Sequence, residues 1–86
     1  MRESCLDCTL KHLAQAIILL TESKLGHPEY KWLVIGNLAE AEAESAKDYL
    51  EITKRIRDIR HKITEDNDNI DLMTLIQEIG EIEKNG

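Results

Sequence analysis

One uninterrupted stretch decides the fold of this chain: residues 29–64 read EYKWLVIGNLAEAEAESAKDYLEITKRIRDIRHKIT. The stretch has no proline, and its weakest point as a helix is Gly36, which costs about 1 kcal/mol relative to alanine. Its apolar and small residues recur every three or four positions along one stripe, which is the periodicity of an α-helix. We therefore expect one long helix, roughly 50 Å at about 1.5 Å per residue.

Two shorter helices flank this stretch. Leucines and isoleucines at alternating steps of four and three predict a helix over about residues 4–25, which Gly26 and Pro28 would end. A polar turn over residues 65–69 separates the long helix from a third, expected over about residues 69–83. A chain of 86 residues supports a single hydrophobic core, so we expect one helical domain spanning residues 1–86.

The expected architecture is all-α, with a helical hairpin and a third helix arranged around one long central helix. A compact chain of this length has a radius of gyration of only about 12 Å, too small to cover such a helix. The first half of the helix also carries a second apolar line, formed by Trp32, Ile35, Ala39, Ala46 and Leu50. We expect this line to pair with a second copy in an antiparallel dimeric bundle. The alternative is a monomer in which the helix breaks near Gly36 and forms an ordinary three-helix bundle.

The composition narrows the class of partner. The net charge is −6, which argues against generic binding to nucleic acid or to anionic membranes. No apolar run is long enough to cross a membrane and no signal peptide is recognisable, so we expect a cytoplasmic protein without a membrane partner. In the cytoplasm the two cysteines would be reduced thiols. A protein partner other than a second copy is left open, with no indication of its identity.

Cys5, Cys8 and His12 carry the most chemistry in the chain. Their spacing of three and then four residues places two sulfurs and an imidazole on one side of a helix. Two thiolates and an imidazole suit zinc, or iron, and form our candidate metal site. Packing of these residues against an apolar flank, with no cofactor at all, is an equally open interpretation.

A tetrahedral metal site needs a fourth ligand. In a hairpin that turns near residue 27, Cys5 would lie level with Tyr49 and His12 level with Glu42. The candidates in reach are Glu42, Glu44, Ser45 and Asp48. Glu42 and Asp48 are the first choices, and a ligand from a partner copy is the alternative.

The same two cysteines also allow a redox interpretation. We expect Cys5 at the first position of its helix, where the positive end of the helix dipole lowers the pKa of a thiol. A reversible Cys5–Cys8 disulfide would then resemble the local arrangement in thioredoxin-type proteins. The strands that normally accompany that motif are not predicted here, which argues against an oxidoreductase.

Two motifs resemble a group of small bacterial and phage-encoded proteins. The first is the run C-x-x-C-x-x-K-H-L over residues 5–13, and the second is GNLAEAE over residues 36–42. The resemblance covers the first half of the chain and implies a shared fold and a linked pair of motifs, without an activity. A histidine often occupies the Asn37 position in that group, so the resemblance implies that this chain lacks one ligand present there.

No pattern of residues predicts catalysis. Glu40, Glu42 and Glu44 are expected to form a solvated face, and neither a catalytic triad order nor a glycine-rich phosphate loop is present. We expect a small helical binding or assembly module, not an enzyme, with a candidate Cys/Cys/His metal site. The alternatives are a thiol redox sensor that uses Cys5 and Cys8, and a purely structural protein–protein interaction module.

Overall fold

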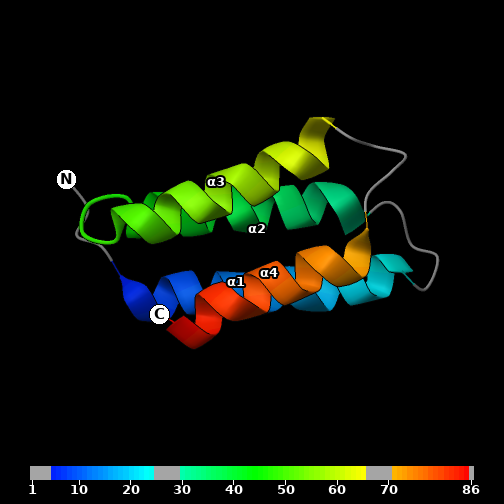
Figure 1. Cartoon of the computed structure of the whole chain (residues 1–86), viewed down its shortest axis with the longest axis horizontal. Helices are drawn as coiled ribbons and strands as arrows, with labels where there is room; N and C mark the ends of the chain where they lie inside the picture. The colour runs from blue at the N-terminus through cyan, green and yellow to red at the C-terminus, as the bar shows by residue number, and fades with distance from the viewer. Residues whose placement is uncertain (1–4, 25–29, 66–70, 86) are drawn as a thin grey trace.

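The computed structural model describes residues 5–24, 30–65 and 71–85 of the chain. Within these ranges it contains four helices and no strand, which confirms the all-α class (Figure 1). The helices are α1 (Leu6–Lys24), α2 (Tyr30–Ser45), α3 (Leu50–Glu65) and α4 (Leu72–Asn85).

The four helices form a bundle measuring 37 × 21 × 20 Å, with a Cα radius of gyration of 12.1 Å. α1 packs against α2 and α4, while α3 packs mainly against α2 (Figure 1). Each helix places a large apolar side chain with no solvent exposure in the common core: Leu13, Leu38, Ile56 and Ile79. The helical periodicity of the sequence thus produces four apolar faces directed to one centre.

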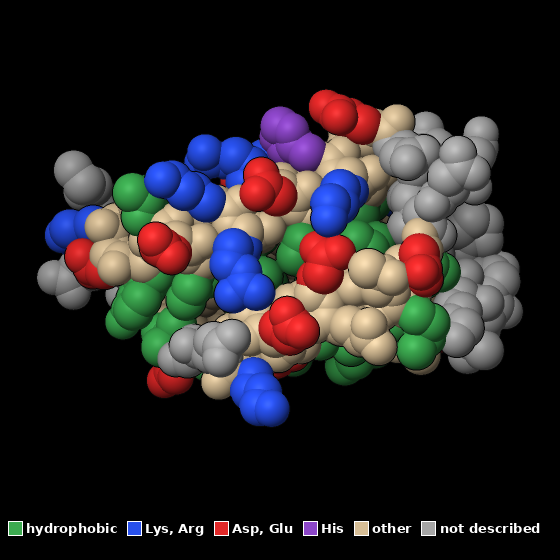
Figure 2. All heavy atoms as spheres, in the orientation of Figure 1, with side chains coloured by type: hydrophobic (Ala, Val, Ile, Leu, Met, Phe, Trp, Pro, Cys, Tyr) green, Lys and Arg blue, Asp and Glu red, His purple; other side chains and the backbone are tan. Residues whose placement is uncertain are grey.

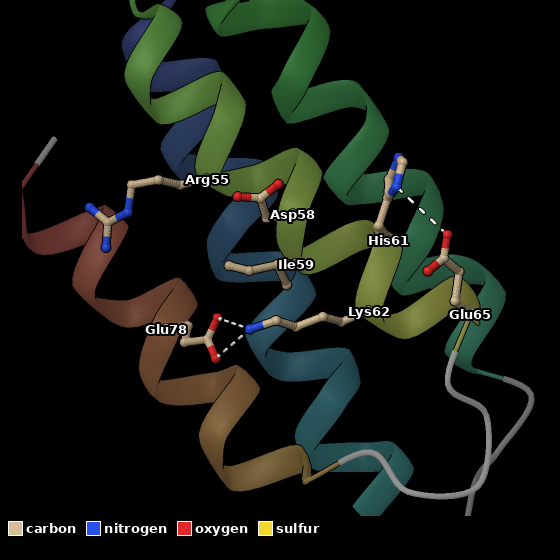
Figure 3. Close-up of a pocket in the computed structure, with 7 residues that line it drawn as sticks. All are labelled: Arg55, Asp58, Ile59, His61, Lys62, Glu65 and Glu78. Atoms are coloured by element: carbon tan, nitrogen blue, oxygen red, sulfur yellow. Dashed lines mark hydrogen bonds and ion pairs between the residues drawn. The ribbon is translucent and has the colours of Figure 1, made fainter.

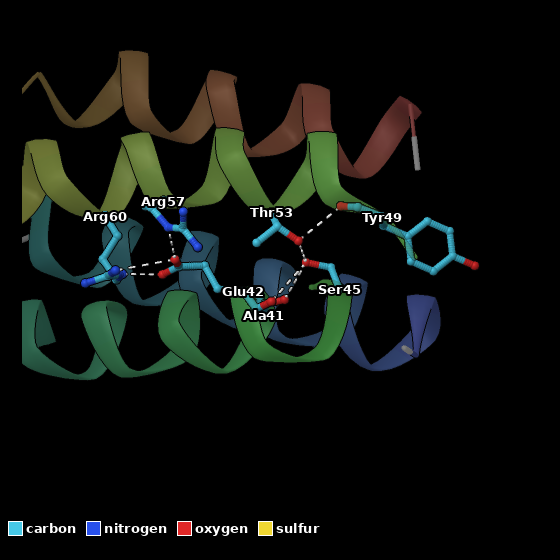
Figure 4. A network of polar contacts seen from close by, with 7 residues as sticks. All are labelled: Ala41, Glu42, Ser45, Tyr49, Thr53, Arg57 and Arg60. Carbon is cyan, nitrogen blue, oxygen red and sulfur yellow. Dashed lines mark hydrogen bonds and ion pairs between the residues drawn. The ribbon is translucent and has the colours of Figure 1, made fainter. Parts of the chain in front are cut away.

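The expected long central helix is two helices in the structure. α2 ends at Ser45, a turn occupies residues 46–48, and α3 begins at Leu50. The Ser45 hydroxyl bonds back to the Ala41 carbonyl at 3.0 Å and across to the Thr53 hydroxyl at 2.6 Å (Figure 4). Such hydroxyl bonds compete with continuation of a helix and here join the end of α2 to the start of α3.

Folding back at this turn explains why the long helix is not formed. A straight helix would leave half of its apolar stripe without cover, whereas the turn buries Val34 and Leu38 of α2 in the same core as Ile56 and Ile59 of α3. Burial of that apolar surface outweighs the few helical hydrogen bonds lost at the turn, since a fully buried side chain contributes about 1.5–3 kcal/mol. The alternative break near Gly36 is also wrong, because this residue lies within α2.

The helix starts differ from expectation by a few residues. α1 begins at Leu6 and not at residue 4, and α4 begins at Leu72 and not at residue 69. Asp71 caps α4, because its Oδ1 accepts backbone hydrogen bonds from Met73 at 3.1 Å and Thr74 at 3.3 Å. The expected turn at Gly26 and Pro28 lies outside the described residues.

The surface of the bundle is predominantly polar on one face. Figure 2 shows lysine, arginine, aspartate and glutamate side chains interspersed over this side of the molecule. Among the four described helices, none combines the length and the apolar character that crossing a bilayer requires.

Candidate functional site

The N-terminus of α1 carries both cysteines, joined by a disulfide between Cys5 and Cys8. Cys5 is the residue before α1, and its Sγ accepts a hydrogen bond from the backbone N–H of Cys8 at 3.1 Å. Cys5 therefore occupies the N-cap, not the expected first helical position. Its sulfur still lies at the positive end of the α1 dipole, which favours a thiolate when the pair is reduced.

The start of α1 is bonded to the end of α2. The Cys5 backbone N–H donates to the carbonyl oxygen of Glu44 at 2.9 Å. That carbonyl belongs to the last turn of α2, where carbonyl groups find no partner within their own helix. We expected Tyr49 at this level, so the register of the hairpin differs from the prediction. The difference decides which carboxylate reaches His12.

His12 is held by two acceptors. Its Nδ1 lies 2.6 Å from Oε1 of Glu44 and 3.1 Å from the carbonyl oxygen of Cys8. Because both neighbours can only accept, Nδ1 must carry the hydrogen, and in the neutral ring Nε2 is the nitrogen with a free lone pair. The Glu44 side chain is only 7 % exposed, so His12 also supplies the partner that a buried carboxylate needs.

Glu40 completes a group of three potential ligands. One ligand atom from each of His12, Glu40 and Glu44 lies within 4.8 Å of the others. Glu40 and Glu44 are one helical turn apart on α2, so they share a side of that helix. His12 reaches the same place from α1, which makes the α1–α2 interface the location of the site.

The same interface contains a shallow hollow. Cys8, His12 and Glu44 line it, whereas Cys5 does not. Its other lining residues are polar or cationic: Lys11, Gln15 and Asn37. The hollow therefore brings two of the three predicted residues, Cys8 and His12, together with Glu44, which was not a first choice for the fourth ligand.

Glu42, a first choice for the fourth ligand, lies elsewhere. Its carboxylate accepts a hydrogen bond from Arg57 Nε at 3.0 Å and further bonds from Arg60, both on α3 (Figure 4). The hydrogen bond to Glu42 raises the pKa of Arg60 above its ordinary value. Asp48, the other first choice, is exposed in the turn after α2 and does not line the hollow.

The expected solvated glutamate face is not formed. Only Glu40 is exposed, while Glu42 and Glu44 are buried. Residues two apart on a helix point about 200° away from each other, so Glu42 faces α3 while Glu44 faces α1. Arg57 and Arg60 compensate the burial of the Glu42 carboxylate. His12 does the same for the Glu44 carboxylate.

The predicted dimer line is mostly on the surface. Trp32 is 71 % exposed and Leu50 is 55 % exposed, and Ala39 and Ala46 are exposed as well. Ile35 differs, because it is half-buried and packs against the core of its own chain.

No family model, curated protein or solved structure matches this chain in comparisons with known proteins. The chemistry of the site is therefore argued from the geometry of its own residues.

Sequence reasoning undervalued Glu40 and Glu44. A signal for them is present, because Asn37, Glu40 and Glu44 repeat on α2 the steps of three and four that relate Cys5, Cys8 and His12 on α1. Two antiparallel helices with matching polar steps can bring these sets face to face. The spacing alone does not fix the register of the two helices, which in the structure places the Cys5 N–H against the Glu44 carbonyl.

Proposed function

We propose that this chain is a small helical binding module that holds a thiophilic divalent ion, zinc or iron, at the α1–α2 interface. Cys5, Cys8 and His12 would supply two thiolates and one imidazole once the disulfide is reduced. The cytoplasmic location expected from the sequence would keep the thiols in that state. Glu40 replaces Glu42 and Asp48 as the candidate for the fourth ligand, because it is a carboxylate near His12 and, unlike Glu44, is not the hydrogen-bond acceptor of His12 Nδ1.

The observation that carries this proposal is the pairing of His12 with Glu44. Metal-bound histidines commonly donate one ring N–H to a carboxylate or a carbonyl and bind the metal through the other nitrogen. Nδ1 of His12 has both kinds of acceptor, at 2.6 Å and 3.1 Å. Nε2 is thereby the nitrogen left for a metal, in a hollow that Cys8 also lines.

Cobalt titration of the reduced, metal-free protein tests the proposal. We expect one Co²⁺ per chain and an ultraviolet sulfur-to-cobalt charge-transfer absorption, which Cys5→Ser and Cys8→Ser each reduce. His12→Ala should weaken Co²⁺ binding by at least about tenfold, the smallest loss typical even of an outer-shell partner. His61→Ala is the matched control, because His61 is an exposed histidine on α3.

The absence of the sulfur-to-cobalt absorption in the reduced protein would overturn the proposal. Equal cobalt binding by the wild type and His12→Ala would remove the imidazole from the ligand set.

A thiol redox sensor is the second candidate, favoured by the Cys5–Cys8 disulfide itself. With glutathione disulfide as oxidant, both thiols lose their protons and one electron each as the Cys5–Cys8 bond forms, and two molecules of glutathione thiol are released. For a sensor that works without metal, His12→Ala leaves the response to oxidant unchanged, whereas Cys8→Ser abolishes it. A metal module predicts damage from both changes.

We also propose that two copies associate through the outer face of α2. Trp32, Gly36, Ala39 and Ala43 are all exposed, and their steps of four, three and four read the same in both directions. An antiparallel second copy therefore meets the same pattern, as an isologous interface requires. This pairing would also serve a purely structural interaction module, which would tolerate Cys5→Ser and Cys8→Ser.

Sedimentation velocity tests the association. We expect a concentration-dependent dimer that Ala39→Glu converts to a monomer, because the change buries a charge at the centre of the interface. Lys54→Glu is the control, because Lys54 is an exposed residue of α3, and this variant should leave the dimer intact. A wild-type monomer at all accessible concentrations overturns this proposal without affecting the metal proposal.

A further inference from the structure

The disulfide form of the protein keeps a set of ligands that does not include sulfur. His12, Glu40 and Glu44 hold their ligand atoms within 4.8 Å of one another while Cys5 and Cys8 are bonded together. Oxidation of the cysteines removes the soft ligands and leaves an imidazole and two carboxylates. The α1–α2 interface thus offers a metal a different set of ligand atoms in each redox state of the cysteines.

Glu40 and Glu44 are two carboxylates in this set. They are like charges one helical turn apart, an arrangement that destabilises a helix and that a bound cation would relieve. Glu44 is also buried, which raises the cost of its charge. Lys11 also lines the hollow, as an exposed side chain on a flexible stem that can turn away from a bound cation.

Asn37 adds a neutral oxygen to the set. Its amide nitrogen donates to the carbonyl of Leu33 at 2.9 Å, which assigns Oδ1 as the atom that remains available as an acceptor. Asn37 lines the hollow together with His12 and Glu44. One imidazole nitrogen, two carboxylates and an amide oxygen are ligands suited to Mn²⁺ or Fe²⁺ with water in the remaining positions.

We propose that the disulfide form of this protein binds a divalent cation of the manganese or ferrous class through His12, Glu40 and Glu44, with Asn37 beside them. The cation would replace the hydrogen between Nδ1 of His12 and Oε1 of Glu44, and the ring hydrogen would move to Nε2. This site does not depend on thiolates, so it stands or fails independently of the zinc-type site proposed above. Formation of the Cys5–Cys8 bond would change the metal preference of the interface from soft to hard ions.

Manganese titration of the oxidised protein, followed by loss of the free Mn²⁺ electron paramagnetic resonance signal, tests the inference. We expect one Mn²⁺ per chain, with binding weakened at least about tenfold by Glu40→Gln and by Glu44→Gln. Glu40 is exposed, so its amide variant should fold normally, as circular dichroism would verify. The control is Glu51→Gln, an exposed glutamate in the first turn of α3, which should bind Mn²⁺ as the wild type does.

The double variant Cys5→Ser/Cys8→Ser separates the two proposals. It should keep Mn²⁺ binding within about twofold and lose the sulfur-to-cobalt absorption. Failure of the oxidised wild type to bind Mn²⁺, or unchanged binding by Glu40→Gln, would falsify the carboxylate site. Absence of the cobalt absorption from the reduced wild type, with Mn²⁺ binding by the oxidised wild type intact, would overturn only the thiolate site.

Discussion

The α1–α2 interface and the α3–α4 interface are built in opposite ways. α1 and α2 pack closely along their length, with fully buried Leu13 and Leu38 between them and the bond from Cys5 to Glu44 at one end. α3 and α4 have the fewest contacts of the neighbouring helix pairs. The first interface is closed by apolar burial, whereas the second is largely open.

Charged side chains line the open interface. Figure 3 shows Lys62 reaching across from α3 to Glu78 on α4, with N–O distances of 3.3 Å. Arg55 lies 3.9 Å from Glu81 in the same region. Exposed pairs of this kind contribute about 0–1 kcal/mol each, so they give register more than stability. The proposed site therefore lies on the more closely packed side of the bundle, between α1 and α2.

The largest loss of stability is expected for a substitution at the α1–α2 interface. Leu38→Ala removes a fully buried side chain of α2 and should lower the free energy of unfolding by about 2–5 kcal/mol. Urea unfolding with the disulfide intact measures it. Ile18→Ala is the matched control, because Ile18 is 53 % exposed on α1 and should cost less than about 1 kcal/mol. Similar losses for both variants would contradict the difference in burial between Leu38 and Ile18.

An intermediate loss of stability is expected for a substitution between α2 and α3. Glu42→Ala removes the buried acceptor shared by Arg57 and Arg60. Arg57 is more than half exposed and can turn to water, so we expect a loss of about 1–2 kcal/mol, below that for a fully buried pair. Chemical denaturation gives the value, and Glu51→Ala, an exposed glutamate of α3, should change it little. The Glu42→Ala variant should still bind Co²⁺. If it does not, Glu42 is a metal ligand after all.

A smaller effect is expected for Glu83 on α4. Burial raises the pKa of this carboxyl above its ordinary value, and its charge also lies near the unfavourable C-terminal end of the helix. At neutral pH the folded state carries this penalty, so Glu83→Gln should stabilise the protein by about 0.3–0.5 kcal/mol. The penalty is relieved as the pH falls through the raised pKa and is absent below the ordinary one. Thermal unfolding across this range should show the difference between variant and wild type vanish in acid.

The smallest loss of stability is expected for a substitution at the α3–α4 interface. Lys62→Ala removes the bridge to Glu78 and should cost no more than about 0.5 kcal/mol. Salt on the order of 1 M should erase the difference from the wild type, because exposed charges are screened. A loss as large as that of Leu38→Ala would mean that the two interfaces are equivalent, contrary to the comparison above.

The sequence was sufficient for the helical class and for the inward-facing residues of α3. Ile56, Ile59 and Ile63 lie on the predicted stripe and are buried. The turn after Ser45 could not be predicted, because residues 46–49 include neither glycine nor proline. The bond between Ser45 and Thr53 that accompanies the turn exists only once α3 has folded back.

The candidate site was predicted in its α1 half only. Cys5, Cys8 and His12 are on one side of α1 because their spacing follows helical geometry. Glu42 lies away from His12 because it faces α3, where it accepts hydrogen bonds from two arginines. Glu44 is two residues further along α2 and therefore lies on the side that faces α1. Which glutamate faces α1 is set by tertiary packing, which local spacing does not encode.

The division between α1–α2 and α3–α4 has a consequence for how this protein can diverge. Every group of the proposed metal sites lies between Cys5 and Glu44, on one helical hairpin. The second hairpin supplies apolar cover and Arg57 and Arg60, which neutralise Glu42, but no ligand. Related chains should therefore preserve the identity of residues in the first hairpin and only the apolar pattern in the second, so that the second hairpin could be exchanged for another of the same shape.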